Sequence, residues 1–151
     1  LELNAELTDN FSIDFGSGFN QTEFQDYPDC APGLNCDGHE LVYAPKVTSS
    51  LGLNYNRPLT DRYDLFSRLG VTYRGEQYYD VTNNPLYKGN SATLVDGTIG
   101  IQTSDARWSV ALWGRNLADE DYVVGLAPDQ IGTNVTLGVP RTFGIRLSAT
   151  Y

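Results

Sequence analysis

Residues 142–151 read TFGIRLSATY, and this stretch decides the fold class of the 151-residue chain. Apolar side chains occupy every second position in it, at Phe143, Ile145, Leu147, Ala149 and Tyr151. The positions between them carry Thr, Gly, Arg and Ser. A period of two places all the apolar side chains on one face of an extended strand. The stretch therefore predicts a β-strand with one apolar and one polar face.

The same alternation recurs earlier in the chain. The segments cover residues 1–7, 11–20, 47–56, 63–76, 95–102 and 107–116. In the last of them the apolar face is ambiguous, because the even positions from Trp108 and the odd positions Ala111 and Trp113 are both apolar. No segment shows the 3.6-residue period of an amphipathic helix, and glycine interrupts nearly every run. The sequence therefore predicts an all-β protein of about seven strands.

The connections between these segments alternate in length. Short ones fall at residues 8–10, 57–62 (which include Pro58) and 104–106. Long ones fall at about residues 25–42, 80–91 and 117–140. If consecutive strands run antiparallel, up and down, all the short turns lie at one edge of the sheet and all the long loops at the other.

The length of the predicted strands favours a membrane barrel. They run to about 10–14 residues, against a usual mode of about 5–6. An 11-residue strand rises about 36 Å, and a tilt of about 40° reduces that height to about 28 Å, close to the ~25 Å apolar band of an outer-membrane barrel. Aromatic residues also stand near strand ends, as in barrel girdles; they are Tyr43, Tyr55, Tyr63, Tyr73, Phe143 and Tyr151.

We therefore predict an antiparallel up-and-down transmembrane β-barrel. Alternation by itself leaves a soluble β-sandwich open, in which the apolar faces pack together and the protein is a binding or adhesion module. On the polar face of the barrel, charged side chains are expected to pair within the wall or against a plug inside the barrel, rather than to bind a substrate. These are Arg68, Arg74, Glu76, Asp96 and Arg146.

Composition argues against several classes of function. Ten Lys and Arg stand against nineteen Asp and Glu, and the formal net charge of −9 argues against a nucleic-acid partner. No nucleophile–base arrangement, phosphate-binding glycine loop or set of metal ligands is visible, so we expect no enzyme, cofactor or bound metal. The chain contains no Met, so Leu1 is not a translation start, and we expect a mature product or a fragment.

The two cysteines, Cys30 and Cys36, lie in a stretch rich in Pro, Gly, Asn and Asp. We predict a disulfide that closes a small loop in an oxidising compartment outside the cytoplasm. Two reduced thiols are the alternative. A zinc site is disfavoured, because no further Cys or His ligands lie nearby.

Two stretches near the end of the chain resemble the carboxy-terminal region of TonB-dependent outer-membrane receptors. The first is WGRNLADEDY at residues 113–122, with the Asn116-Leu117 pair and a following Tyr122. The second is GVPRTFGIRLSATY at residues 138–151, with Pro140-Arg141 before an aromatic-Gly pair and a final strand. The stretch LVYAPKVTSSLGLNY at residues 41–55 is similar to a recurring strand of the same receptors.

This resemblance implies a 22-stranded barrel of which residues 1–151 form the carboxy-terminal third, without the plug domain and the earlier strands. It implies TonB-energised uptake of a scarce nutrient, such as a siderophore, cobalamin or saccharide, across the outer membrane of a Gram-negative bacterium. The implied partners are outer-membrane lipid, the plug and remaining strands, the TonB complex, the nutrient and the barrel assembly machinery. Phe143, Ile145, Leu147 and Tyr151 would form the assembly signal, although the last residue is more often Phe. A complete eight-stranded outer-membrane barrel is the runner-up.

The long loops supply the candidate ligand-binding residues, because aromatic and imidazole side chains can stack on a small molecule or hydrogen-bond to it. They are Tyr27, His39, Tyr78, Tyr79, Tyr87 and Tyr122. Packing within the loops or a girdle is the alternative role of the tyrosines, and solvent exposure that of His39. The acidic run Asp119-Glu120-Asp121 could bind calcium, but it lacks the ligand spacing of a dedicated site and is expected to be a solvated loop.

Overall fold

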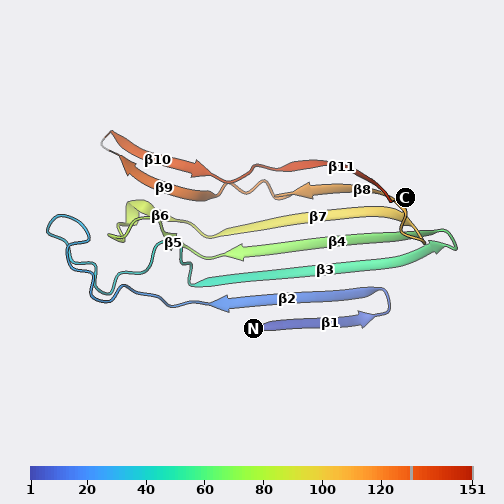
Figure 1. The fold of residues 1–151 in the computed structure, drawn as a ribbon, viewed down its shortest axis with the longest axis horizontal. Coiled ribbons are helices and arrows are strands. Elements are labelled where there is room, and N and C mark those ends of the chain that lie inside the picture. The colour runs from blue at the N-terminus through green and yellow to red at the C-terminus, as the bar shows by residue number, and fades with distance from the viewer. Residues whose placement is uncertain (130, 151) are drawn as a thin grey trace.

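The computed structural model describes residues 1–129 and 131–150. A single antiparallel sheet of seven strands dominates it, and the strands run up and down in chain order (Figure 1). Across the sheet they are β1 (Glu2–Thr8), β2 (Phe11–Phe19), β3 (Val47–Thr60), β4 (Tyr63–Arg74), β7 (Ala92–Thr103), β8 (Trp108–Arg115) and β11 (Thr142–Ala149). The predicted all-β, up-and-down fold is confirmed. The sheet is not closed here, because β1 and β11 are its two outermost strands and do not pair with each other.

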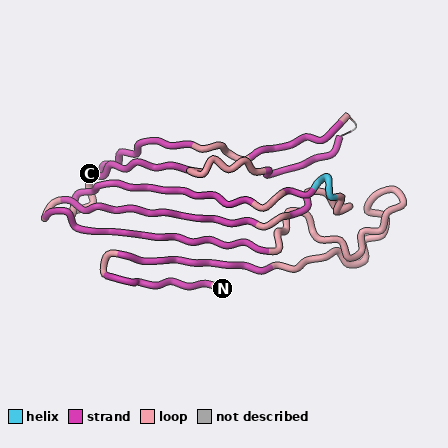
Figure 2. The backbone as a smooth tube through the Cα atoms, turned by 180° about the vertical axis from the view of Figure 1, so that it is seen from behind, coloured by secondary structure: helices cyan, strands magenta, loops and turns pink. Residues whose placement is uncertain are grey.

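Smaller elements lie in the long connections. In the second of them, β5 (Gln77–Tyr78) pairs with β6 (Lys88–Gly89) across the short 3₁₀ helix η1 (Pro85–Tyr87). In the third, β9 (Val123–Asp129) and β10 (Gly132–Leu137) form a hairpin (Figure 2). This hairpin lies in a segment that the sequence predicts to be a loop, because its strands show no clean alternation. Within the described residues, no helix has the length and apolar character needed to cross a membrane.

The short connection predicted at residues 57–62 is wrong in its bounds. β3 continues through Pro58 to Thr60, which leaves a tight turn at Asp61 and Arg62. Proline lacks a backbone donor and is confined to positions where no neighbouring strand needs one. The even-numbered amides of β3 face β2, as shown by the bond from Asn56 N to Asn10 O, but β2 begins only at Phe11. Pro58 therefore lies beyond the end of β2, where its missing N–H has no partner to lose.

The cross-strand register unites the apolar positions into one continuous face. Leu3, Phe15, Leu51, Val71 and Val95 are successive partners from β1 to β7. Directly paired residues of antiparallel strands point to the same side of the sheet. The apolar side chains of seven strands therefore form one surface, called the apolar face below.

The same register settles the orientation of β8. Leu65, Ile101, Val110 and Leu147 are successive partners from β4 to β11. Trp108, Val110 and Leu112 therefore lie on the apolar face, whereas Ala111 and Trp113 lie on the opposite, polar face.

The apolar face is uncovered. Leu112 is 57% exposed, Leu147 77% and Phe143 79%. Among the described residues, the buried hydrophobic side chains are few and are Cys36, Tyr79, Ala92 and Ala111. No second sheet packs against the apolar face within the described part of the chain. The soluble β-sandwich, which requires that face to be buried, is therefore wrong for this structure.

The polar face carries a compact hydrogen-bonded cluster. Asp14 Oδ1 accepts from Asn54 Nδ2 at 2.9 Å, and its Oδ2 lies 3.5 Å from an Arg68 guanidinium nitrogen. A Cβ atom at Gly52 would lie 2.1 Å from Asp14 Oδ2, so the carboxylate holds this position only because Gly52 has no side chain. Arg68 thus pairs within the wall, as expected from the sequence.

Candidate ligand-binding loops

Three long loops lie at one end of the strands, and the short turns lie at the other end, which is called the short-turn edge below (Figure 2). Residues 20–46 connect β2 to β3, residues 75–91 connect β4 to β7, and residues 116–141 connect β8 to β11. Hydrogen bonds join the first loop to the second and the second to the third. The three loops together are called the loop assembly below.

The first loop contains a small closed ring of chain. A disulfide joins Cys30 to Cys36, with 5.9 Å between their Cα atoms, and Cys36 is fully buried. Asp37, next to this ring, accepts hydrogen bonds from the backbone N–H of Tyr27 and the side-chain amide of Asn35. These donors hold the pKa of the Asp37 carboxyl below its usual value, and the Tyr27 N–H is the larger cause. The ring of Tyr27 packs at 5.1 Å against that of Phe24.

Two side chains bind the first loop to the second. His39 Nδ1 lies 3.0 Å from the carbonyl oxygen of Val81. Asn83 Oδ1 accepts from the backbone N–H of Glu40 at 2.6 Å, and Asn83 Nδ2 donates to the Glu40 carbonyl at 3.0 Å. This two-point contact imitates the pairing of adjacent strands. Asn83 has a φ of 53°, a left-handed conformation that asparagine tolerates better than most residues.

Tyr79 lies at the centre of the loop assembly. It is 6% exposed, and its hydroxyl donates to the Val123 carbonyl of the third loop at 2.7 Å. Its ring meets that of Tyr43 edge-on at 5.1 Å. Gly89 is required beside it, because a Cβ there would lie 2.4 Å from Tyr79 Cε2. These contacts give Tyr79 a packing role in which its hydroxyl is already occupied.

Tyr78 and Tyr87 remain half-buried. The Lys88 ammonium lies 5.7 Å from the centroid of the Tyr78 ring, within the range of a cation–π contact. Tyr87 belongs to η1, and its carbonyl accepts the backbone N–H of Tyr79 at 2.9 Å. Both rings therefore keep part of their surface accessible to a ligand.

Tyr122 and Asn116 hold the base of the third loop. The Tyr122 ring lies over Gly138, where a Cβ would come within 1.9 Å of its Cζ. Asn116 is 4% exposed; its backbone N–H donates to Asp96 Oδ1 at 2.9 Å, and its side-chain nitrogen donates to the carbonyls of Glu120 and Val139. Asp96 thus finds its partner in the third loop, at the Asn116 backbone N–H, rather than within the wall.

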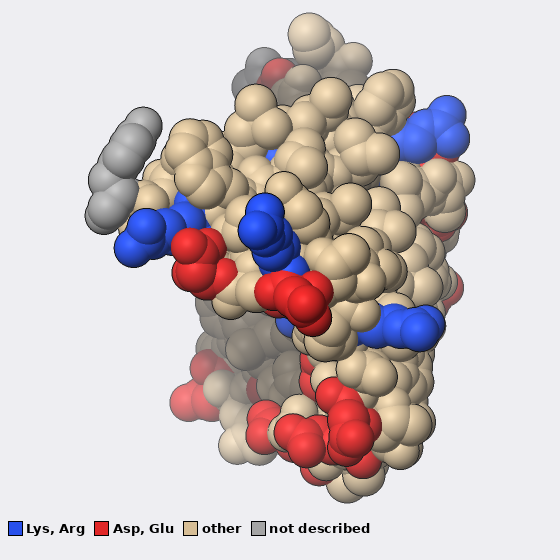
Figure 3. All heavy atoms as spheres, turned by 90° about the vertical axis from the view of Figure 1, so that its right-hand side faces the viewer, with Lys and Arg blue, Asp and Glu red and all other residues tan. Residues whose placement is uncertain are grey.

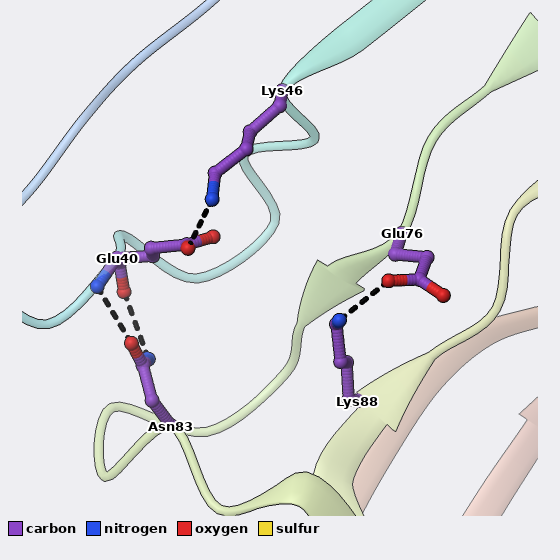
Figure 4. Close-up of polar contacts among 5 residues, drawn as sticks. All are labelled: Glu40, Lys46, Glu76, Asn83 and Lys88. Carbon is purple, nitrogen blue, oxygen red and sulfur yellow. Dashed lines mark hydrogen bonds and ion pairs between the residues drawn. The ribbon is translucent and has the colours of Figure 1, made fainter.

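Two ion pairs lie at the junction of the loops with the sheet. The Lys46 ammonium is 2.5 Å from Glu40 Oε1, and Lys88 pairs with Glu76 (Figure 4). The hydrogen bond from Lys88 to Glu76 is the main cause of the raised pKa of Lys88. All four side chains line an open hollow of about 310 Å³. Such exposed pairs contribute about 0–1 kcal/mol each, so they orient the loops more than they stabilise them.

In the part of the chain that the structure describes, no group of three or more His, Cys, Asp or Glu side chains converges on one point. In the acidic run, Asp119 pairs with Arg141 at 3.2 Å. The Glu120 backbone N–H donates to Asn116 Oδ1.

The structure gathers the sequence-predicted residues unevenly. All six residues lie in loops that touch: His39 contacts the second loop, which carries Tyr78, Tyr79 and Tyr87. Tyr122 lies at the base of the third loop, and Tyr27 lies beside the disulfide ring. Asn83 and Asn116 also hold the loops in place, although neither is among the sequence-predicted residues. The turn composition around Asn83-Asn84-Pro85 was the signal available for Asn83.

The proposed assembly signal lies on the edge strand β11. Phe143, Ile145 and Leu147 all point from the apolar face and are 67–79% exposed. Tyr151, the fourth member, lies outside the described residues.

Comparison with known proteins identifies the class of this fold. Residues 1–117 match the family described as TonB dependent receptor-like, beta-barrel, and the chain belongs to that family. Its members are outer-membrane receptors and transporters of Gram-negative bacteria rather than enzymes, and they act with a plug domain, TonB and a ligand.

Three solved structures share the fold. The ferric yersiniabactin uptake receptor FyuA from Yersinia pestis covers 98% of this chain with a TM-score of 0.81 at 18% identity. The siderophore receptor PiuA from Acinetobacter baumannii covers 99% with a TM-score of 0.76 at 21% identity. BauA, the ferric preacinetobactin receptor from Acinetobacter baumannii, covers 97% with a TM-score of 0.66 at 21% identity. The chain spans only 20–22% of the length of these proteins.

Proposed function

We propose that residues 1–151 form the carboxy-terminal part of the barrel wall of a TonB-dependent receptor that imports a scarce nutrient across the outer membrane. The uncovered apolar face carries this proposal. Each large apolar side chain left in water forgoes about 1.5–3 kcal/mol, so a face that spans seven strands requires an apolar medium. β3, with 14 residues, and β4 and β7, with 12 each, have the length to cross that medium at a tilt.

The two open edges support a larger barrel. Unpaired strand edges expose backbone donors and acceptors, which lipid cannot satisfy. β1 and β11 would therefore pair with strands of the same receptor outside this chain, and the barrel would total 22 strands around a plug. The barrel assembly machinery would recognise β11. A complete eight-stranded barrel would instead need both edges to meet through one more strand.

The loop assembly is the proposed ligand-binding part of this chain. Its accessible aromatic rings, Tyr27, Tyr78 and Tyr87, suit a ligand with a flat or apolar surface, and His39 belongs to the same loop assembly. We propose a siderophore-class ligand ahead of cobalamin or a saccharide, because one structural neighbour is named a siderophore receptor and the other two are named as receptors for ferric compounds.

Uptake assays test this proposal. The full-length receptor, expressed in a Gram-negative strain that lacks its own siderophore receptors, should restore growth on ferric siderophores as the only iron source. Growth should be lost when tonB is deleted. Cobalamin-dependent or maltodextrin-dependent growth without iron uptake would replace the siderophore class with that nutrient. A receptor recovered from the soluble fraction would refute the barrel itself.

A loop variant tests the site separately. Tyr27→Ala and Tyr87→Ala should each weaken ligand binding by about three- to tenfold, the loss of a partly exposed aromatic contact. Tyr55→Ala, in the middle of the apolar face of β3, is the matched control and should leave ligand affinity unchanged. Equal affinities in all three variants would place the ligand on parts of the receptor outside these loops.

A further inference from the structure

The short-turn edge of the sheet, opposite the loop assembly, has a hollow that continues from the apolar face onto the turns. Its apolar part is a groove of about 340 Å³. The side chains that form it are Tyr63, Ile101, Trp108, Val110, Leu147 and Ala149. The register explains the shape, because Thr103 lies between the two aromatic residues, opposite Tyr63 and bonded through its hydroxyl to the Trp108 N–H at 3.1 Å. Ala149 is the partner of Trp108 on β11. The small side chains of Thr103 and Ala149 beside the Tyr63 and Trp108 rings leave the groove open.

The polar part is a cleft of about 430 Å³ formed by the two neighbouring turns. Asp61 and Arg62 line it from the β3–β4 turn, and Asp105 and Arg107 from the β7–β8 turn. Ser104 joins the turns, with its N–H donating to the Arg62 carbonyl at 2.9 Å. Figure 3 looks onto this edge and shows basic and acidic side chains next to one another. The cleft shares Tyr63, Thr103 and Trp108 with the groove, so the two hollows are continuous.

We propose that this continuous hollow binds one phospholipid of the surrounding bilayer, whose headgroup carries both a phosphate and a primary ammonium. An acyl chain would lie in the groove and the headgroup in the cleft. The inference rests on the proposed function, because it needs the apolar face to lie in a bilayer.

The charges of the cleft favour a zwitterionic headgroup. Arg62 and Arg107 supply guanidinium donors that match a phosphate in two-point contacts. Arg107 is 71% exposed and lies 3.5 Å from Asp105 through Nε, which leaves its terminal nitrogens for a ligand. A purely anionic headgroup would meet the carboxylates of Asp61 and Asp105 as well, whereas an ammonium neutralises them. A trimethylated ammonium cannot donate hydrogen bonds, so the ethanolamine type fits better than the choline type.

The depth of the site agrees with this ligand. Trp and Tyr side chains gather where the hydrocarbon meets the headgroups, because their rings are apolar and their tips polar. Trp108 and Tyr63 stand between the groove and the cleft, at the position of that boundary. The Thr103 hydroxyl and the backbone N–H of Arg107 both donate to the Asp105 carboxylate. They lower the pKa of this carboxyl, and the Thr103 hydroxyl is the larger cause, so Asp105 is anionic at neutral pH.

Native mass spectrometry of the full-length receptor tests the proposal. The receptor is first shown to reside in the outer-membrane fraction, then exchanged into detergent with phosphatidylethanolamine, phosphatidylcholine or phosphatidylglycerol. We expect one retained phosphatidylethanolamine per receptor, and at least about tenfold weaker retention of the other two. The double variant Arg62→Gln/Arg107→Gln should lose that lipid to a similar degree. Ala149→Phe, which fills the groove and leaves the charges intact, should also displace it.

Arg57→Gln is the matched control. Arg57 is an exposed arginine of β3 near the same short-turn edge, where its cross-strand partner is Leu65. It lines neither hollow. It should retain the lipid at the wild-type level. Equal retention in the cleft and groove variants, equal binding of all three phospholipids, or retention of lipopolysaccharide alone would overturn the inference while leaving a membrane-inserted receptor intact. A receptor absent from the membrane fraction would overturn the proposed function first.

Discussion

The side chain of Asn116 and the backbone of Glu120 exchange two hydrogen bonds, each 2.9 Å long. Asn116 Nδ2 donates to the Glu120 carbonyl, and the Glu120 N–H donates to Asn116 Oδ1. The asparagine amide thus replaces a strand partner at the point where β8 ends. Its φ of 49° turns the chain there, and Leu117 lies over Gly97 and Gly114 of the adjacent strands. The Asn-Leu pair noticed in the sequence therefore closes the base of the third loop.

Asn116→Ala should open this base. The variant leaves the N–H and C=O of Glu120 and the carbonyl of Val139 without their partner, at a cost of about 2–3 kcal/mol locally. Hydrogen exchange at the Glu120 amide and proteolysis within residues 117–141 should both become faster. Asn134→Ala, in the exposed β10 of the same loop, is the control. Equal exchange rates in the two variants would contradict the role of Asn116.

The assignment of faces predicts opposite results at neighbouring positions of β3. Leu51 lies on the apolar face between Phe15 and Val71, and Ser50 lies on the polar face between Gly16 and Thr72. Leu51→Arg should cost about 2–4 kcal/mol if that face meets lipid, whereas Ser50→Arg should cost under about 1 kcal/mol. The yield of heat-modifiable receptor in outer membranes measures the difference. A larger loss from Ser50→Arg would reverse the faces.

Two glycines of the polar face should respond differently to one added methyl group. At Gly100 a Cβ would lie 2.5 Å from the Val110 carbonyl oxygen and 2.6 Å from Phe66 Cζ, whereas at Gly70 its nearest contact would be 3.9 Å away. Gly100→Ala should therefore destabilise the pairing of β7 with β8 by about 1–3 kcal/mol, the usual cost of overpacking. Gly70→Ala should be neutral within about 0.5 kcal/mol. Denaturant unfolding of the reconstituted receptor compares them.

Acid should loosen the disulfide loop through Asp37. The folded-state pKa of this carboxyl lies below its usual value of 3.8, so its stabilising bonds are complete above about pH 4 and are lost as the pH falls through the lowered folded pKa. Exchange of the Tyr27 amide, corrected for intrinsic rate, should then rise at acid pH. In Asp37→Ala, which has no acceptor, it should be fast already at neutral pH and nearly independent of pH. Asp29→Asn, in the same loop, should behave as wild type.

Features that depend on residues close together in the sequence could be predicted from it. Features that depend on contacts between distant segments could not. The alternation of residues 142–151 and its repeats predicted seven strands, their up-and-down order and the edge that carries the long loops. Side-chain period is a local property, set by the pleat of a single strand. Pro58 shows the limit: it resembled a turn signal, and only the early end of β2 makes it acceptable inside β3.

The sequence by itself determined that most strands of the seven-stranded sheet have one apolar side, because that follows from neighbours two residues apart. Only the tertiary structure decided that these sides join into one uncovered face, that Trp108 rather than Trp113 belongs to it, and that Tyr79 and Asn83 hold the loops together. Register and loop contacts join residues that are far apart in the chain. Their partners are fixed when the strands pair, and no local pattern specifies them.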